Sequence, residues 1–209
     1  MLRVKNRVHD NGFERVAKAF NSHGGILRTM EAVRACGISR RAFYAMRTAG
    51  KFEQLGRGLY RLANEQSLGN PDLAVVAKRA PKGVVCLISA LSFHRLTTQI
   101  PHEVQLALSE GAEPPRIKQP PVQIIHMGKT SFLAGIETHR LDGVDVRVYS
   151  PEKTLADCFK FRNKIGLDTA LEGLRLYKDR KSINVDELVR CAAICRVDKV
   201  MRPYLETFL

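Results

Sequence analysis

The chain has 209 residues, 44% hydrophobic and 26% charged, which is ordinary for a globular protein of one large or two modest domains. Its formal net charge of +13 favours a polyanionic partner, nucleic acid before a membrane surface. Apolar runs such as Gly83–Leu91 are far shorter than the ~20 residues of a membrane span, and the basic N-terminus lacks the apolar core of a secretory signal. We therefore expect no membrane partner and a cytoplasmic location.

The five cysteines are odd in number and show no disulfide framework, which favours free thiols in a reducing cytoplasm. Cys191 and Cys195 are four residues apart on a predicted helix and can share a metal. No Cys-x-x-Cys motif or nearby histidine pair completes a zinc set. Thiols of the core are the favoured interpretation, and we expect neither a metal nor a cofactor.

Two domains are predicted, over residues 1–66 and 67–209. Residues 1–66 hold 13 Lys or Arg against 5 Asp or Glu, and thus more than half of the positive excess. The segment Ala63–Pro71 contains two Asn, a Ser, a Gly and a Pro, a composition typical of a linker. The boundary is therefore placed there.

The first domain is predicted to be a winged helix-turn-helix. Ser39 is a helix N-cap by type, Gly37 ends the preceding helix, and Gly56-Arg57-Gly58 suits a tight hairpin turn. This layout places one helix in the major groove of DNA and a β-hairpin wing on the flanking backbone. The predicted elements are helices over Phe13–Ser22, Leu27–Cys36 and Arg40–Ala49 and a hairpin over Lys51–Leu62.

The helix Arg40–Ala49 is predicted to read DNA, because one arc of its helical wheel is polar and basic. Arginine can pair bidentately with guanine or clamp phosphate. Arg57 is predicted at the wing tip, and Lys51 and Arg61 on phosphates. The predicted reading face consists of Arg40, Arg41, Tyr44, Arg47 and Thr48. The side packed on the other helices is predicted to hold Ala42, Ala45, Met46 and Ala49, with Phe43 at its edge.

The second domain is predicted to be α+β, with a small, largely antiparallel sheet followed by C-terminal helices. Asp142-Gly143 between two apolar runs is a strong hairpin signal, and Ser150-Pro151-Glu152 is a good helix start. Asp168 is predicted to cap the next helix. The expected helices before the sheet are Pro71–Ala80 and Val84–Leu96, the strands are Val104–Leu108, Val122–His126, Gly135–His139 and Val144–Tyr149, and the later helices are Pro151–Asn163, Thr169–Lys178, one to Cys195 and a terminal one.

No catalytic site is predicted in this domain. Asp157 is interpreted as a buried partner of Lys or Arg or a solvated acid, with a partner contact as the alternative, and His94 as a core or cap histidine. A metal-dependent nuclease is a weaker alternative, because Glu137, Asp142 and Asp145 surround one hairpin. No lysine follows them at a suitable spacing, and no phosphate-binding glycine loop is present.

Several segments resemble the AbiEi family, the antitoxins of bacterial abortive-infection (type IV) toxin–antitoxin systems. Leu55–Leu62 reads Leu-Gly-Arg-Gly-Leu-Tyr-Arg-Leu, a motif that many winged helices share. The C-terminal match is more specific, and the resemblance extends over about residues 13–195. The matching C-terminal segments are Ile88–Thr97, Ile100-Pro101, Val146–Phe159 and Lys164–Glu172.

The resemblance implies an autorepressor that binds repeats in its own promoter, as a homodimer or as adjacent monomers, and that counteracts a nucleotidyltransferase-type toxin encoded next to it. It implies no enzymatic activity. An open alternative is a stand-alone winged-helix regulator whose second domain senses a ligand. Residues in and after the Val146–Phe159 segment are weak candidates for a partner contact, namely Asp157, Lys160, Arg162 and Lys164.

Overall fold

The computed structural model describes residues 13, 15–20, 22, 25–63, 70–141 and 143–208. By compactness the chain divides into two units, Met1–Lys78 with Arg140–Asp145, and Arg79–His139 with Val146–Leu209. The predicted boundary between residues 66 and 67 lies outside the described residues. The division into 1–66 and 67–209 therefore stays a prediction.

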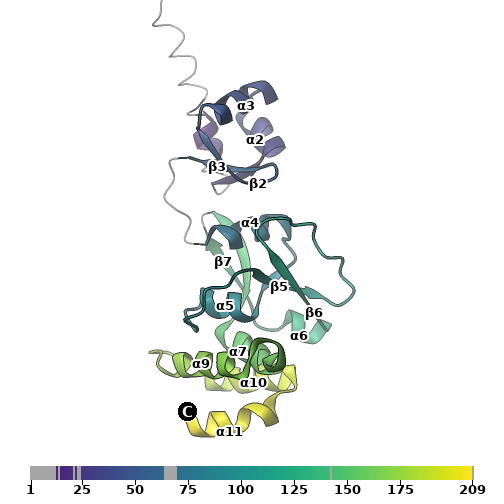
Figure 1. Ribbon diagram of the computed structural model, residues 1–209, viewed down its shortest axis with the longest axis vertical. Coiled ribbons are helices and arrows are strands. Elements are labelled where there is room, and N and C mark those ends of the chain that lie inside the picture. Colours follow the sequence, from purple (N-terminus) through teal and green to yellow (C-terminus); the bar gives the residue numbers. More distant parts are fainter. Residues whose placement is uncertain are drawn as a thin grey trace, which may run out of the picture. The chain divides into compact units, whose positions relative to one another are not determined.

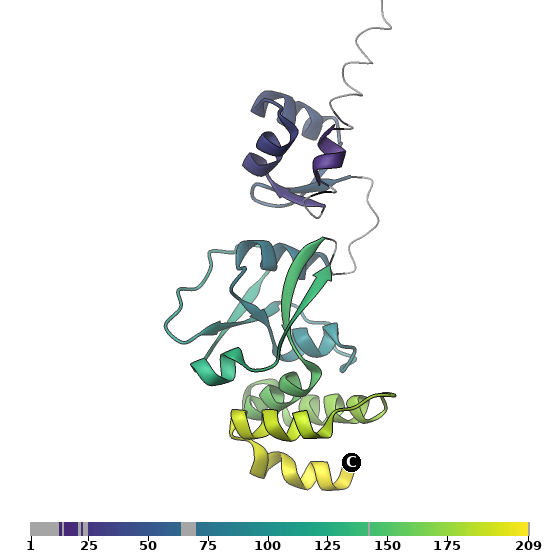
Figure 2. The same cartoon turned by 180° about the vertical axis from the view of Figure 1, so that it is seen from behind.

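The N-terminal unit contains a three-stranded sheet with helices on one side of it (Figures 1 and 2). The strands are antiparallel in the order β1-β3-β2, and residues 15–20 are helical. The elements that follow are β1 (Ile26–Arg28), α2 (Thr29–Cys36), α3 (Arg40–Thr48), β2 (Phe52–Gly56) and β3 (Leu59–Leu62). This is the helix, turn, helix and hairpin order predicted from the sequence.

The turn between α2 and α3 forms where the glycine and serine signals predict it. Gly37 has φ +61°, a left-handed conformation that glycine adopts without the steric cost of a Cβ atom. Ser39 then accepts a hydrogen bond from the backbone N–H of Ala42 at 3.1 Å, which satisfies one of the free donors at the start of α3.

Aromatic packing holds α3 on the sheet. Phe43 is fully buried and its ring stacks on that of Phe52, with centroids 4.9 Å apart. Tyr60 of β3 meets the edge of Phe43 at 5.0 Å, and Phe20 stacks on the other side of Phe52 at 5.4 Å. Pairs of this geometry add to the free energy of apolar burial, so Phe43 fixes which face of α3 is turned outward.

The start of the second predicted helix is wrong. Ile26–Arg28 form β1, which pairs with β3 so that Leu27 lies opposite Tyr60, and the helix begins at Thr29. A three-residue strand has no periodicity of its own, because its pairing partner lies more than thirty residues later in the chain. Tertiary pairing therefore overrides the local helical pattern.

After residue 70 the chain forms α4 and then an α+β unit whose central helix is α7. Figures 1 and 2 show α7, α9, α10 and α11 gathered as a helical layer beside the sheet. The elements are α4 (Pro71–Arg79), β4 (Val84–Val85), α5 (Leu87–Phe93), β5 (Val104–Ser109), β6 (Val122–Met127), α6 (Lys129–Leu133), β7 (Ile136–Leu141), β8 (Val144–Tyr149), α7 (Pro151–Lys160), α8 (Arg162–Ile165), α9 (Leu167–Lys178), α10 (Val185–Cys195) and α11 (Asp198–Phe208). The α+β class is confirmed.

The second sheet has the order β6-β5-β4-β8-β7 and is mixed rather than largely antiparallel. β4 pairs antiparallel with β5 but parallel with β8, and β5 pairs parallel with β6. The sequence missed β4 because Val84–Val85 lie in a continuous apolar run, which predicts burial but does not distinguish strand from helix. The tip of the predicted hairpin includes Asp142, which lies outside the described residues.

α7 is the buried centre of this unit and contacts α5, α9 and α10. Seven consecutive residues from Lys153 to Phe159 are buried, and a helix that is buried all round belongs to a core. Ser150 caps it by accepting from the backbone N–H of Lys153 at 3.2 Å, as predicted. α9 begins two residues earlier than predicted, so Asp168 lies in its first turn instead of capping it.

Candidate nucleic-acid interface

The outward face of α3 carries all five side chains that the sequence predicts for DNA reading. Arg40, Arg41, Tyr44, Arg47 and Thr48 are exposed, and Tyr44 keeps 45% of its surface accessible. Phe43 is fully buried, and Ala42 and Met46 beside it are half-buried. Because successive helical residues are about 100° apart, burial of this side turns Arg41, Tyr44 and Thr48 toward solvent, while Arg40 and Arg47 flank Phe43 and still reach the surface.

Three members of this set contact neighbouring groups, two of them side chains and one a backbone carbonyl. The Nη2 atom of Arg40 donates to the sulfur of Met30 at 3.0 Å, and the guanidinium carbon of Arg47 lies 5.8 Å from the centre of the Tyr60 ring. The hydroxyl of Thr48 donates to the Tyr44 carbonyl at 3.0 Å, which leaves its lone pairs and methyl group for a ligand. Arg40 and Arg47 are therefore positioned by a sulfur atom and an aromatic ring, and these weak contacts can be exchanged for a base or a phosphate.

The wing turn is built from glycine and tied to the start of α2. Gly58 has φ +70°, and its carbonyl accepts a hydrogen bond from the backbone N–H of Thr29 at 3.0 Å. Arg57 lies in this turn and is exposed, as the sequence predicts. A short turn anchored in this way presents Arg57 from a defined position.

The two cations predicted on phosphates have different environments. Lys51 is exposed, with its ammonium 4.9 Å from the centre of the Phe13 ring. Arg61 forms an ion pair with Glu53 on the adjacent strand at 2.5 Å, and its side chain is only 15% exposed. We therefore expect Arg61 to order the wing and Lys51 to remain available to a phosphate.

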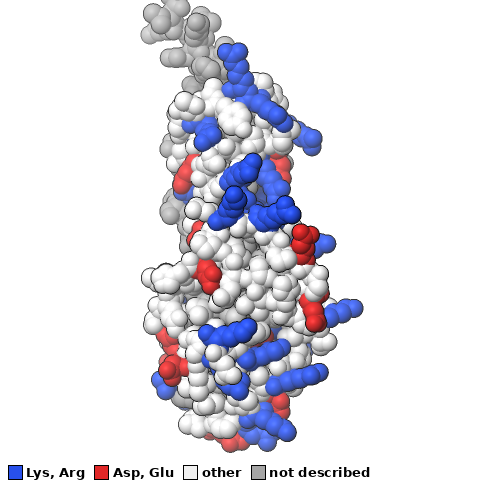
Figure 3. Space-filling view, turned by 45° about the vertical axis from the view of Figure 1, so that its right-hand side comes forward, with Lys and Arg blue, Asp and Glu red and all other residues white. Residues whose placement is uncertain are grey.

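Positive charge dominates this surface. Residues 25–63 contain eight Lys or Arg and two Asp or Glu, and both acids are engaged. Glu31 accepts from the backbone N–H of Arg28 at 2.9 Å, and Glu53 is paired with Arg61. In Figure 3 basic side chains outnumber acidic ones on the face in view, and a basic excess attracts a polyanion.

The sequence assigned one residue of α3 and its C-cap to the wrong side, and it did not mark the exposed Met30 nearby. Ala45 and Ala49 are exposed, although alanine was assigned to the packed side. Met30 of α2 is 40% exposed and touches Arg40. Alanine is equally compatible with the buried and the exposed face of a helix, so its own type does not predict its side. Ala45 lies on the exposed face of α3, where it offers a small apolar contact.

The weak candidates for a partner contact are divided by burial. Asp157 forms an ion pair with Lys153 at 2.5 Å and has no exposed side-chain surface, which agrees with the buried bond to lysine. Lys160 and Lys164 are exposed and Arg162 is half-buried. Burial raises the pKa of the Asp157 carboxyl, while the Lys153 ammonium opposes that shift.

The remaining titratable candidates have structural partners. His94 caps the end of α5 and bonds through Nε2 to the Tyr149 carbonyl at 2.7 Å, and burial lowers its pKa. Glu137 contacts His139 at 2.9 Å and Asp145 contacts Arg140 at 2.7 Å, whereas Asp142 lies outside the described residues. Within the described ranges no His, Cys, Asp and Glu side chains gather as a metal site, and all five cysteines are free and buried.

Comparison with known proteins identifies the segment that carries this surface. Residues 14–63 match the model of a family described as transcriptional regulator, AbiEi antitoxin. This segment is similar to the AbiEi-type regulator domain. The resemblance seen in the sequence is thus confirmed where the helix-turn-helix and wing lie, and the match includes the whole outward face of α3. The AbiEi-type domain ends at β3, just before the predicted linker.

A solved structure extends the likeness in fold beyond the AbiEi-type domain. The RV2827C protein from Mycobacterium tuberculosis, known from a crystal structure, matches 88% of this chain with 71% of its own, at a TM-score of 0.58 and 13% identity. At that identity the likeness concerns the fold alone. No curated protein matches the chain in sequence. In the part of the chain that is described, no helix has the length and apolar character of a membrane span.

Proposed function

We propose that the chain is a sequence-specific DNA-binding regulator that represses its own operon through α3 and the β2–β3 wing. The observation that supports this most is the shared outward direction of three arginines, a tyrosine and a threonine on one helix of an AbiEi-type domain. Such a helix has the width and donor pattern that a major groove accepts.

Two roles divide the basic residues in this proposal. Arg41 and Arg47 lie on the exposed arc of α3 and supply planar forks for base edges. Arg57 and Lys51 supply charge for the backbone, which adds affinity and salt sensitivity but no sequence information. Arg61 acts indirectly by holding the wing through its ion pair with Glu53.

A reporter experiment tests repression. The DNA upstream of the chain's own gene is fused to a reporter, and expression is measured with the wild-type protein and with the double variant Arg41→Ala/Arg47→Ala. A matched control, Lys178→Ala/Lys181→Ala, removes two exposed cations from the C-terminal unit.

We expect the wild type and the control to repress the reporter and the α3 double variant to lose repression. Absence of repression by the wild type contradicts autoregulation. Full repression by the α3 double variant contradicts the assignment of the reading helix.

We further propose that the protein counteracts a nucleotidyltransferase-type toxin encoded beside it. The support is the family of residues 14–63, which is described as an antitoxin. Co-expression with the neighbouring gene tests it: growth arrest by that gene alone and rescue by this chain are expected. An innocuous neighbour, or a toxic one that this chain does not counteract, removes the antitoxin activity and leaves the regulator.

A further inference from the structure

A pocket of about 570 Å³ opens on the C-terminal unit, between the start of α6, the end of α7 and the turn after α10. Its size is within the range of small-molecule sites, roughly 300–1,000 Å³. The lining combines Gly128, Lys129, Thr130, Ser131, Lys160, Arg162, Ile194, Cys195, Arg196 and Val197. Four of these are Lys or Arg and none is Asp or Glu.

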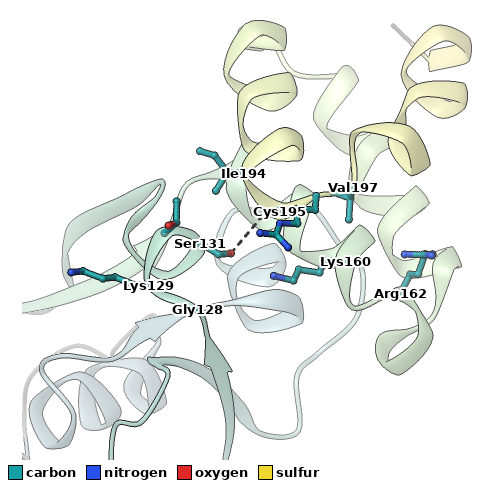
Figure 4. A pocket seen from close by; sticks show the side chains of 10 residues that line it. Gly128, Lys129, Ser131, Lys160, Arg162, Ile194, Cys195 and Val197 are labelled. Carbon is teal, nitrogen blue, oxygen red and sulfur yellow. Dashed lines mark hydrogen bonds between the residues drawn. The ribbon is translucent and has the colours of Figure 1, made fainter.

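The four cations are not paired within the described ranges, where no carboxylate forms an ion pair with Lys129, Lys160, Arg162 or Arg196. In Figure 4 the ammonium of Lys160 points toward Ser131 and Cys195, while Lys129 and Arg162 flank the pocket with their heads turned outward. Long side chains of this kind can turn inward when an anion supplies the partner.

Among the described residues, the one acid that contacts the buried lining residue Cys195 is Asp157, and its charge is matched by Lys153. Cys195, 2% exposed, donates its S–H to Asp157 at 3.3 Å, and Ser131 lies 3.8 Å from the Cys195 sulfur. The Asp157 charge is already matched by Lys153. A second acid, Glu110, lies near Gly128, with its carboxylate 3.9 Å from where a Cβ of that residue would lie, so an anion is favoured away from Gly128.

The backbone of Arg196 is the left-handed C-cap of α10, with its N–H bonded to the carbonyls of Ala192 and Ala193. It ends α10 with φ +58°, a left-handed conformation in which glycine is the usual residue and a Cβ is unfavourable. Strain of this kind persists where surrounding structure or function maintains it. Here the strained position places an arginine on the pocket wall.

We propose that this pocket binds a phosphorylated organic anion. Its phosphate groups contact Lys160 and Arg196, with Lys129 and Arg162 turning in from the sides, because Arg and Lys are the phosphate-binding side chains of proteins. The carbon part of the ligand lies against Ile194 and Val197, the apolar members of the lining. The site is separate from the α3 surface, and the proposal does not rest on the DNA-binding function.

Isothermal titration calorimetry of the full chain at physiological salt tests the proposal with two probes, ATP and inorganic tripolyphosphate. Lys160→Ala removes the cation that points inward. Arg196→Gly removes the guanidinium and also relieves the left-handed backbone, so the fold is expected to be at least as heat-stable as the wild type. Lys181→Ala is the matched control, since it removes an exposed cation that does not line the pocket.

We expect saturable binding of ATP with one site per chain, weakened about tenfold or more by Lys160→Ala and by Arg196→Gly and within twofold of wild type for Lys181→Ala. Tripolyphosphate that binds as tightly as ATP overturns the organic part of the proposal and leaves a site for phosphate groups alone. No saturable binding of either probe, or an equal loss in Lys181→Ala, overturns the pocket. If a short DNA duplex competes with ATP for the wild-type pocket, the proposal is overturned, because the pocket then binds the phosphates of a nucleic acid.

Discussion

Removal of one charge from the buried Lys153–Asp157 pair should be far more costly than removal of both. The two side chains are one helical turn apart on α7, have no solvent exposure and meet at 2.5 Å. The ammonium also lies 4.2 Å from the centre of the Tyr149 ring, and Cys195 donates to the second carboxylate oxygen at 3.3 Å. Both carboxylate oxygens therefore have partners.

The magnitude follows from two opposing terms. At this distance the attraction is about 7 kcal/mol for an effective dielectric constant of about 20, and desolvation costs several kcal/mol for each ion. The pair is thus close to neutral for folding. Lys153→Met leaves a buried carboxylate unmatched and should lower the free energy of unfolding by about 3–5 kcal/mol, a large share of the roughly 5–15 kcal/mol of a typical protein.

The double variant Lys153→Met/Asp157→Leu replaces the pair with apolar side chains of similar size and should be destabilised by only about 0–2 kcal/mol. Urea unfolding of wild type, both single variants and the double variant measures the coupling directly. Single losses that simply add up in the double variant would refute the compensation between the two charges.

The pH dependence of Lys153→Met gives a second test. Burial raises the pKa of Asp157, and Lys153 is the main opposing influence, so its removal should raise that pKa further. A raised folded pKa favours the protonated, folded form, and the variant should regain stability as pH falls toward the unfolded value. We expect its deficit to be larger at pH 8 than at pH 5.5, whereas equal deficits would contradict an ionised Asp157.

Three further changes probe the DNA surface, a surface carboxylate and a glycine. Arg47→Ala should weaken specific DNA binding by about 1–3 kcal/mol if the side chain contacts a base, measured by fluorescence anisotropy; unchanged affinity removes it from the reading set. The pKa of Glu172 is lowered by hydrogen bonds from two threonines, so Glu172→Gln should destabilise at neutral pH and lose that deficit as pH falls through the lowered pKa; a deficit that is constant with pH contradicts this. Gly135→Ala should cost about 2–4 kcal/mol, because φ is +63° and the added Cβ would lie 2.5 Å from Cβ of Lys153. Gly111→Ala is the control, because φ is +78° and no atom lies within 4 Å of the added Cβ; it should lower the free energy of unfolding by about 1–2 kcal/mol through the backbone conformation alone. Equal losses of unfolding free energy in the two glycine variants would contradict the steric explanation.

Helix α3 was predictable because its signals are local. Ser39 and Gly37 define where the helix starts. Phe43 packs with the wing residues Phe52 and Tyr60 in one buried cluster and so marks the buried side of the helix. The helical period then turns Arg41 outward, whereas Arg40 and Arg47, three and four residues from Phe43, lie at the edges of the buried side. Alanine carries no such information, which is why Ala45 was assigned to the wrong face.

The elements that sequence reasoning missed depend on distant partners or unusual backbone. β4 is two residues long, and Leu87, where α5 begins, has φ +48°, a conformation that no leucine preference predicts. The short helix Lys129–Leu133 has no periodic pattern. Such features arise from packing within the whole unit.

The basic pocket was not predictable for the same reason. Its walls come from three stretches near residues 129, 160 and 196, which only the folded C-terminal unit brings together. The sequence named Lys160 and Arg162 as weak candidates for a partner contact but gave no sign that Lys129 and Arg196 lie near them. The left-handed backbone of Arg196 is invisible before folding.

The central claim, sequence-specific regulation through the AbiEi-type domain, is tested most directly by one binding measurement. The affinity of the full chain is measured for the duplex upstream of its own gene and for a scrambled duplex of the same composition, as salt is raised. The account predicts a preference for the native duplex of about 10³-fold or more that persists at physiological salt. Equal affinity for both duplexes, lost steeply with salt, would contradict it and leave only electrostatic association.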